Sequence, residues 1–144
     1  MADWGEPDLE KELSLIQLAG RDQKARLRSL LGCKKGREKF LASLYHNPPF
    51  DPRYVTVLEM NYDEAVKREL VARGAPDQCY VISNSFEHDG TTMSLDQALQ
   101  ELNDHGWTGD GTILLCVPGR LAYYIGEAHY GGGYTWIVER PSRS

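Results

Sequence analysis

Residues 112–140 read TILLCVPGRLAYYIGEAHYGGGYTWIVER, and this stretch decides the fold class. Two apolar runs, 112–117 and 121–127, flank Pro118-Gly119-Arg120, and the proline and glycine of this triplet are typical of a tight turn. A third run, 134–140, follows three consecutive glycines. The pattern predicts an antiparallel β-hairpin with a third strand after it.

Side chains alternate between the two faces along a strand, so the middle run 121–127 predicts what each face carries. One face receives Leu121, Tyr123 and Ile125, and the other receives Ala122, Tyr124 and Gly126. We therefore expect aromatic side chains on both sides of the sheet.

Before residue 112 the spacing of apolar residues is mostly helical. Helices are predicted at 8–19, from a cap at Asp22 to Gly32, at 35–45, from residue 61 or 62 to Gly74, and at 95–104, where Ser94 and Gln97 form a capping box. Two further strands are predicted, at 54–60 and 79–83. The order predicts an α+β fold, with about three short N-terminal helices followed by helices packed on a small, mainly antiparallel sheet.

Three prolines fall within HNPPFDPR at 46–53, which predicts an extended connector. A chain of 144 residues has the usual length of one domain. We expect a single domain, with a possible subdivision into a helical segment at 8–45, the connector at 46–53 and an α+β body at 54–140.

Charge is unevenly distributed along the chain, whose formal net charge is −5. Residues 21–45 hold eight basic and two acidic residues, whereas residues 46–144 hold seven basic and fourteen acidic residues. Such a basic segment either packs against the acidic body or binds an external anionic partner. Nucleic-acid binding through segment 21–39 would use Arg26, Arg28, Lys34, Lys35 and Arg37, but the overall pI of about 5.3 argues against it.

Membrane insertion and cofactor binding are not predicted. The longest all-apolar run, 113–117, is too short to cross a bilayer, and the acidic first residues lack the features of a secretory signal, so we expect a cytoplasmic protein. Cys33, Cys79 and Cys116 are widely spaced, and the last two lie in apolar runs, so these two are expected to be buried hydrophobic residues. No metal site or cofactor is expected from these spacings.

Two histidine–carboxylate pairs are candidates for general acid–base catalysis. Glu127 and His129 follow a predicted strand, and His88 and Asp89 lie in the polar segment EHDG at 87–90. A small hydrolase or transferase could use either pair. Asp89-Gly90 is equally typical of an exposed turn.

Because no catalytic motif is recognisable, the sequence favours a non-enzymatic, protein-binding module. An inhibitory, immunity-like or regulatory protein that binds another protein through an aromatic-rich sheet surface fits the composition. The residues predicted to contact the partner are Tyr124, Tyr130, Tyr134, Trp136 and Arg120.

Overall fold

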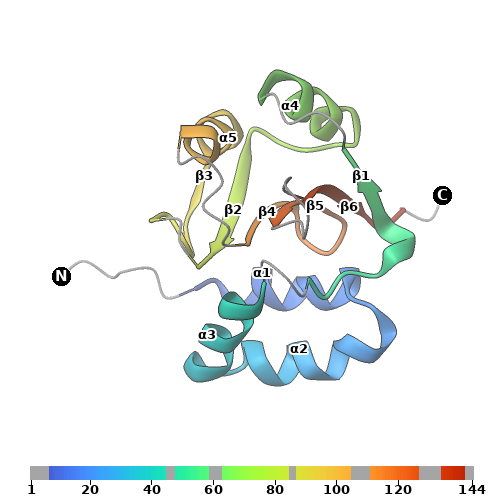
Figure 1. Ribbon diagram of the computed structural model, residues 1–144, viewed down its shortest axis with the longest axis vertical. Helices are drawn as coiled ribbons and strands as arrows, with labels where there is room; N and C mark the ends of the chain where they lie inside the picture. The colour runs from blue at the N-terminus through green and yellow to red at the C-terminus, as the bar shows by residue number, and fades with distance from the viewer. Residues whose placement is uncertain are drawn as a thin grey trace.

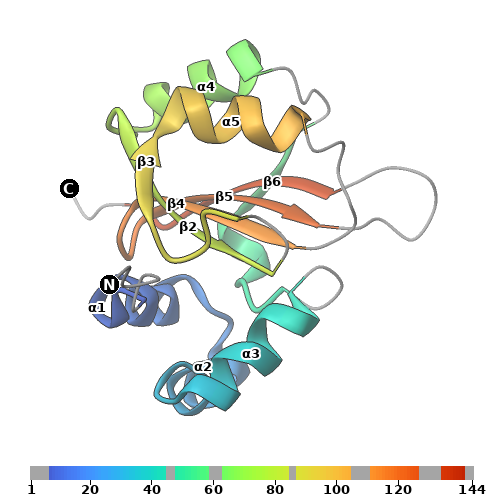
Figure 2. The ribbon, with the colours of Figure 1, turned by 90° about the vertical axis from the view of Figure 1, so that its left-hand side faces the viewer.

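An antiparallel sheet forms the middle of three layers in the computed structural model, which describes residues 7–44, 48–58, 63–84, 87–104, 111–126 and 134–141 (Figures 1 and 2). Within these residues the sheet has six strands in the order β1-β6-β5-β4-β2-β3. They are β1 (Val55–Val57), β2 (Gln78–Ser83), β3 (Thr92–Ser94), β4 (Thr112–Val117), β5 (Leu121–Gly126) and β6 (Tyr134–Glu139). The predicted α+β class, with helices before the sheet, is confirmed.

Helices cover both faces of the sheet (Figure 2). On one side lie α1 (Leu9–Leu13), which continues into the 3₁₀ helix η1 (Ser14–Leu18), then η2 (Arg21–Gln23), α2 (Lys24–Leu31) and α3 (Lys34–Ser43). On the other side lie α4 (Asp63–Ala72) and α5 (Leu95–Asp104). A short 3₁₀ helix, η3 (Pro52–Tyr54), leads into β1. None of the helices in the described ranges is long and apolar enough to span a membrane.

Two predicted local features, the turn at Gly119 and the helix cap at Ser94, are confirmed. Gly119 has a φ of +77°, which a glycine adopts without steric cost, and it turns β4 into β5 as expected. At the start of α5 the Ser94 hydroxyl accepts a hydrogen bond from the Gln97 amide at 3.1 Å, as the capping box predicts.

Other elements differ from the prediction. Asp22 does not cap α2, because the chain forms η2 first and Gln23 occupies the N-cap position without a side-chain bond. The segment 92–94, for which no strand was predicted, pairs with β2 as an edge strand. β1 spans three residues rather than seven, and positions 59–62 of the predicted strand and helix lie outside the described residues.

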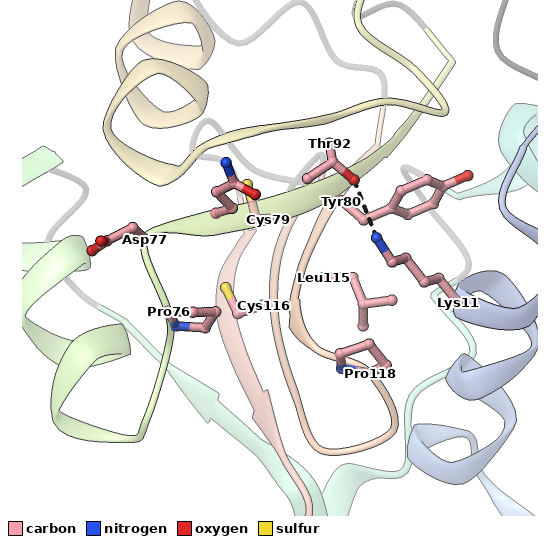
Figure 3. A pocket seen from close by; sticks show the side chains of 10 residues that line it. Lys11, Pro76, Asp77, Cys79, Tyr80, Thr92, Leu115, Cys116 and Pro118 are labelled. Atoms are coloured by element: carbon pink, nitrogen blue, oxygen red, sulfur yellow. Dashed lines mark hydrogen bonds between the residues drawn. The ribbon is translucent and has the colours of Figure 1, made fainter.

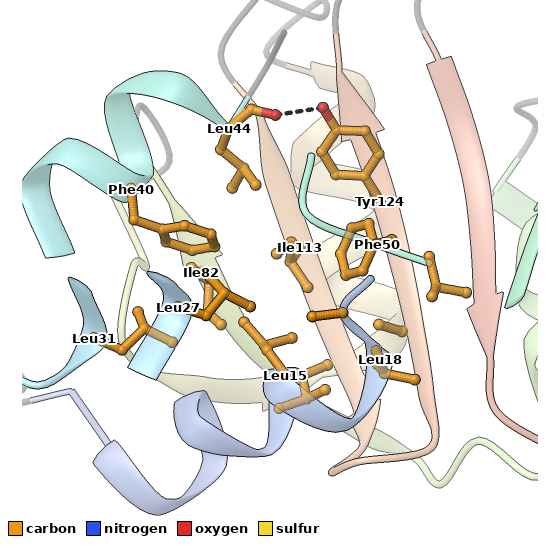
Figure 4. Packing of buried hydrophobic residues seen from close by; sticks show 14 of the residues in the cluster. Leu15, Leu18, Leu27, Leu31, Phe40, Leu44, Phe50, Ile82, Ile113 and Tyr124 are labelled. Carbon is orange, nitrogen blue, oxygen red and sulfur yellow. Dashed lines mark hydrogen bonds between the residues drawn. The ribbon is translucent and has the colours of Figure 1, made fainter. Parts of the chain in front are cut away.

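The N-terminal helices and the sheet share one hydrophobic cluster (Figure 4). Side chains from η1, α2 and α3 pack on inward-facing residues of β2, β4 and β5; the members include Leu15, Leu18, Leu27, Leu31, Phe40, Leu44, Phe50, Ile82, Ile113 and Tyr124. All of them are buried. The helical segment is thus joined to the sheet by apolar packing, which is the main source of its stabilisation.

A second cluster fills the opposite face. Val66 and Leu70 of α4 and Leu95 and Leu99 of α5 pack over the sheet residues Val81, Leu114, Leu121, Tyr123, Ile125 and Ile137. The predicted alternation along β5 is confirmed, with Tyr123 in this cluster and Tyr124 in the other. Because both faces are covered, both sets of aromatic side chains belong to the interior.

Gly36 fixes how closely α2 and α3 approach each other. A Cβ atom at Gly36 would lie 2.2 Å from the Leu30 carbonyl oxygen, a distance that no real contact reaches. The turn between the two helices is completed by Cys33, whose sulfur accepts a hydrogen bond from the Gly36 amide at 3.3 Å. The backbone of α3 at Gly36 therefore packs directly against the backbone of α2 at Leu30.

We predict that Gly36→Ala lowers the free energy of unfolding by about 1–3 kcal/mol, the usual cost of overpacking, although alanine is the better helix former by about 1 kcal/mol. Urea denaturation followed by circular dichroism measures the change. Gly20→Ala is the control, because its nearest non-neighbouring atoms would be 3.9 and 4.0 Å away. Equal effects of the two substitutions would contradict the close-approach argument.

Candidate functional site

The turn at 87–90, between β2 and β3, reaches both helical layers. Its backbone is anchored to β2, because the Gly90 amide donates to the Val81 carbonyl at 2.7 Å and the Val81 amide donates to the Thr91 carbonyl at 2.9 Å. Gly90 has a φ of +79°. Asp89 bonds to α3 on one side of the sheet, whereas the His88 imidazole lies against Glu101 of α5 on the other.

On the first side, Arg37 of α3 lies between two carboxylates. Its guanidinium donates to Glu12 of α1 at 2.9 Å and to Asp89 at 2.8 and 2.9 Å, so both carboxylates are bound in the two-pronged manner typical of arginine. The Tyr80 hydroxyl donates to Glu12 at 2.6 Å, and the Ser83 amide donates to Asp89 at 2.8 Å. We call Glu12, Arg37 and Asp89 the charge clasp.

Burial makes the clasp sensitive to any missing partner. The side chain of Glu12 is 1% exposed and that of Arg37 is 13% exposed. Burial by itself lowers the pKa of the Arg37 guanidinium, but the hydrogen bonds to Asp89 and Glu12 outweigh it and raise that pKa above its ordinary value. Burial and the bond to Glu12 likewise raise the pKa of the Tyr80 hydroxyl. The clasp is therefore charged on Arg37 and neutral on Tyr80 at physiological pH.

On the second side, His88 meets two carboxylates of its own. Its Nε2 atom lies 3.0 Å from Glu101 Oε2 of α5 and 3.6 Å from Glu87 Oε1. These three residues are the one group of metal-ligating side chains found together in the described ranges, with donor atoms within 4.8 Å of one another. We call them the His88 cluster.

Of the two predicted catalytic pairs, the structure describes only His88 and Asp89. His88 and Asp89 are neighbours in sequence, yet their side chains face different layers. Arg37 holds Asp89, whereas the Nε2 atom of His88 lies near Glu87 and Glu101. The geometry therefore does not support Asp89 as the group that orients His88. Glu127 and His129 lie outside the described residues.

The predicted aromatic contact surface needs correction at Tyr124. This side chain is fully buried, donates a hydrogen bond to the Leu44 carbonyl, and packs edge-on against Phe50 with ring centres 5.6 Å apart. Trp136 is partly buried, and its ring centre lies 5.3 Å from that of Tyr124. Tyr130 and the side chain of Tyr134 lie outside the described residues. Tyr124 is unavailable to a partner because the N-terminal helices cover its face of the sheet.

Arg120, whose predicted contact with a partner stays a prediction, joins structural elements within the chain. Its guanidinium donates to the Arg73 carbonyl, just after α4, at 2.9 Å and pairs with Glu139 of β6 at 3.4 Å. Arg73 in turn pairs with the same carboxylate at 2.8 Å. These contacts tie the end of α4 to the sheet.

Four of the five basic residues considered for nucleic-acid binding are solvent-exposed. Arg26 and Arg28 of α2 and Lys34 and Lys35 of α3 are exposed, and no salt bridge to another described residue engages them. Arg37 is the exception, because the charge clasp holds it. We call the four exposed residues the basic face.

A pocket of about 290 Å³ lies between α1 and one end of the sheet (Figure 3). Lys11 donates to Thr92 at 3.2 Å within it, and Leu115, Cys79 and Cys116 contribute to its wall. Burial raises the pKa of the Cys79 thiol to about 12, and burial together with the neighbouring Cys79 raises that of Cys116. Both thiols are protonated at neutral pH, so the pocket lacks a ready nucleophile among its described lining residues.

Comparison with protein-family models, with curated proteins and with solved structures finds no match to this chain. The functional argument therefore rests on the geometry of the described residues.

We predict that Arg37→Met lowers the free energy of unfolding by about 3–5 kcal/mol, since removing one partner leaves a buried carboxylate unpaired. Arg37→Lys should also lower the free energy of unfolding, but by less than Arg37→Met. Lysine keeps the positive charge, yet its ammonium group cannot bind both carboxylates in the two-pronged manner. Urea denaturation measures both changes.

Arg53→Met is the matched control for the clasp. Arg53 also forms an arginine–carboxylate pair, with Asp51 at 2.8 Å, but its side chain is 78% exposed. Exposed pairs contribute little, so this variant should unfold nearly as the parent does. A loss as large as that of Arg37→Met would show that burial is not what gives the clasp its strength.

Thiol accessibility provides a further check on the fold. Cys33 is exposed, whereas Cys79 and Cys116 are buried with raised pKa values. At pH 8 the native protein should react rapidly with Ellman's reagent at one thiol per chain, and the urea-unfolded protein at all three. Rapid reaction of a second thiol in the native protein would contradict the described packing of the sheet.

Proposed function

We propose that this chain is a non-enzymatic protein-binding module whose basic face docks on an acidic surface of a partner protein. The observation that carries the proposal is that Arg26, Arg28, Lys34 and Lys35, all exposed on α2 and α3, form no salt bridge with another described residue. An inhibitory, immunity-like or regulatory role is consistent with such a module.

Binding is favoured over catalysis because the polar groups of the candidate site serve structural contacts. Asp89 is bound by Arg37 and by the Ser83 amide, and Glu12 by Arg37 and Tyr80. In the described pocket both thiols have raised pKa values. Catalytic groups are usually held ready for substrate rather than committed to buried ion pairs.

A protein partner is favoured over nucleic acid by the charges around the basic face. Exposed Asp22 and Glu38 lie on the same helical segment, and the whole chain has a net charge of −5. Both negative charges would repel a phosphate backbone, whose binding rests on clustered basic residues. A protein surface of mixed charge can instead place its own cations opposite Asp22 and Glu38.

Helix geometry supports the basic face as a rigid surface. α2 and α3 bury Leu27, Leu31, Phe40 and Leu41 toward the sheet and are locked together at Gly36. The charged side chains project from the opposite side of this packed pair. A partner would therefore meet cations on a preformed scaffold, which lowers the entropic cost of association.

The test reverses the charge of the basic face. We expect a variant carrying Arg26→Glu, Arg28→Glu, Lys34→Glu and Lys35→Glu to lose the protein that the parent captures stoichiometrically from its native cell. The identified partner, purified, should then bind the parent with an association rate that falls as salt is raised. Mass spectrometry and surface plasmon resonance provide the two measurements.

The matched control changes an exposed charge on the other side of the sheet. Arg68 lies on α4, and Arg68→Glu should leave capture of the partner unchanged. If the basic-face variant captures the same partner as well as the parent does, the docking surface is wrong. If capture is abolished by nuclease treatment, the partner is a nucleic acid and the protein-binding proposal fails.

A further inference from the structure

The His88 cluster lies on the opposite side of the sheet from the basic face, and its residues have no part in the proposed docking. We propose that Glu87, His88 and Glu101 form a binding site for a divalent first-row transition metal of the zinc class. Each residue offers one donor atom, namely the imidazole Nε2 of His88 and one carboxylate oxygen from each glutamate. Three protein ligands with a fourth position left to solvent are typical of accessible zinc sites.

The spacing of the donor atoms fits a single ion. Zinc binds nitrogen and oxygen at about 2.0–2.2 Å, and in a tetrahedral arrangement two such ligand atoms lie about 3.3 Å apart. His88 Nε2 is 3.0 Å from Glu101 Oε2 and 3.6 Å from Glu87 Oε1. These two distances lie on either side of the tetrahedral value, and all three donor atoms lie within 4.8 Å of one another, so rotation of the exposed Glu87 side chain would bring the third donor toward the same ion.

An independent observation comes from the Glu101 carboxylate. Its Oε2 atom is buried and accepts no hydrogen bond from any described residue, although the imidazole nitrogen lies 3.0 Å away. The two atoms therefore lie close together without a hydrogen bond between them. A cation bound by both would satisfy a buried anionic oxygen.

The scaffold holds two of the ligands in place before a metal arrives. His88 precedes Asp89, which Arg37 and the Ser83 amide bind, and the His88 carbonyl accepts a hydrogen bond from the Thr91 amide at 3.1 Å. Glu101 projects from α5, whose apolar face is buried on the sheet. Glu87, 73% exposed, supplies the adjustable third ligand. Ligands on rigid elements lose little freedom when the ion binds.

The donor set indicates which ions the site should prefer. An imidazole nitrogen favours zinc, cobalt, nickel and iron, whereas magnesium and calcium prefer sites made entirely of oxygen. One nitrogen and two carboxylate oxygens therefore select a borderline transition metal. A net charge of −2 from the carboxylates is matched by a divalent cation.

Isothermal titration calorimetry with Zn²⁺ alone tests the site, in a Cys33→Ser background so that the exposed thiol does not compete. We expect one ion per chain with a dissociation constant on the order of micromolar or tighter. Co²⁺ should produce the visible absorption of a four-coordinate ion, and Mg²⁺ at the same concentration should not bind.

Glu87→Gln is the decisive variant, because its exposed carboxylate has little part in folding. It should weaken Zn²⁺ binding about tenfold or more while the melting temperature without metal stays unchanged. His88→Ala and Glu101→Gln should weaken binding further, and Glu64→Gln, an exposed carboxylate on α4, should bind as the parent does.

The proposal is overturned if Zn²⁺ at about 1 mM, a hundredfold or more above the expected dissociation constant, does not bind the parent. It is also overturned if Glu87→Gln and His88→Ala bind Zn²⁺ as tightly as Glu64→Gln, since the ion would then lie elsewhere. Charge reversal of the basic face should leave Zn²⁺ affinity unchanged. The failure of one proposal can thus be told from the failure of the other.

Discussion

The structure depends on the buried guanidinium of Arg37, which joins three parts of the chain that are distant in sequence. It binds Glu12 of α1 and Asp89 of the turn before β3. The Glu12 carboxylate, 1% exposed, would be costly to bury without a cation, and Arg37 needs both carboxylates for its full set of hydrogen bonds. Apolar packing holds the helical layer against the sheet, and the clasp adds directional contacts that join α1, α3 and the turn at 87–90.

Local signals allowed much of the fold to be predicted from the sequence. The Pro118-Gly119 turn and the Ser94 cap act over a few residues, so their chemistry can be read directly, and both are confirmed. β3 was missed because three residues are too few to show a period, and its pairing with β2 is set by the turn between them. The coverage of Tyr124 depends on residues about 80 positions earlier, which periodicity along β5 does not encode.

The candidate site was harder to predict for the same reason. His88 and Asp89 drew attention as a sequence pair, but adjacent residues in a turn point in different directions and bind different neighbours. Their real partners, Glu101 and Arg37, are 13 and 52 positions away. Glu101 carries no motif of its own, and its proximity to His88 follows from the packing of α5 on the sheet. Long-range pairing of this kind requires a tertiary structure.

The uneven charge of the sequence raised the question of whether the basic segment holds the acidic body or binds a partner. The basic side chains of this segment fall into a buried group and an exposed group. Arg37 points inward and neutralises carboxylates of α1 and of the body, whereas Arg26, Arg28, Lys34 and Lys35 point outward. A surface cation contributes little to folding, so the outward group is not needed for stability. Stability alone therefore accounts for one of these five basic residues, and the other four are free to serve recognition.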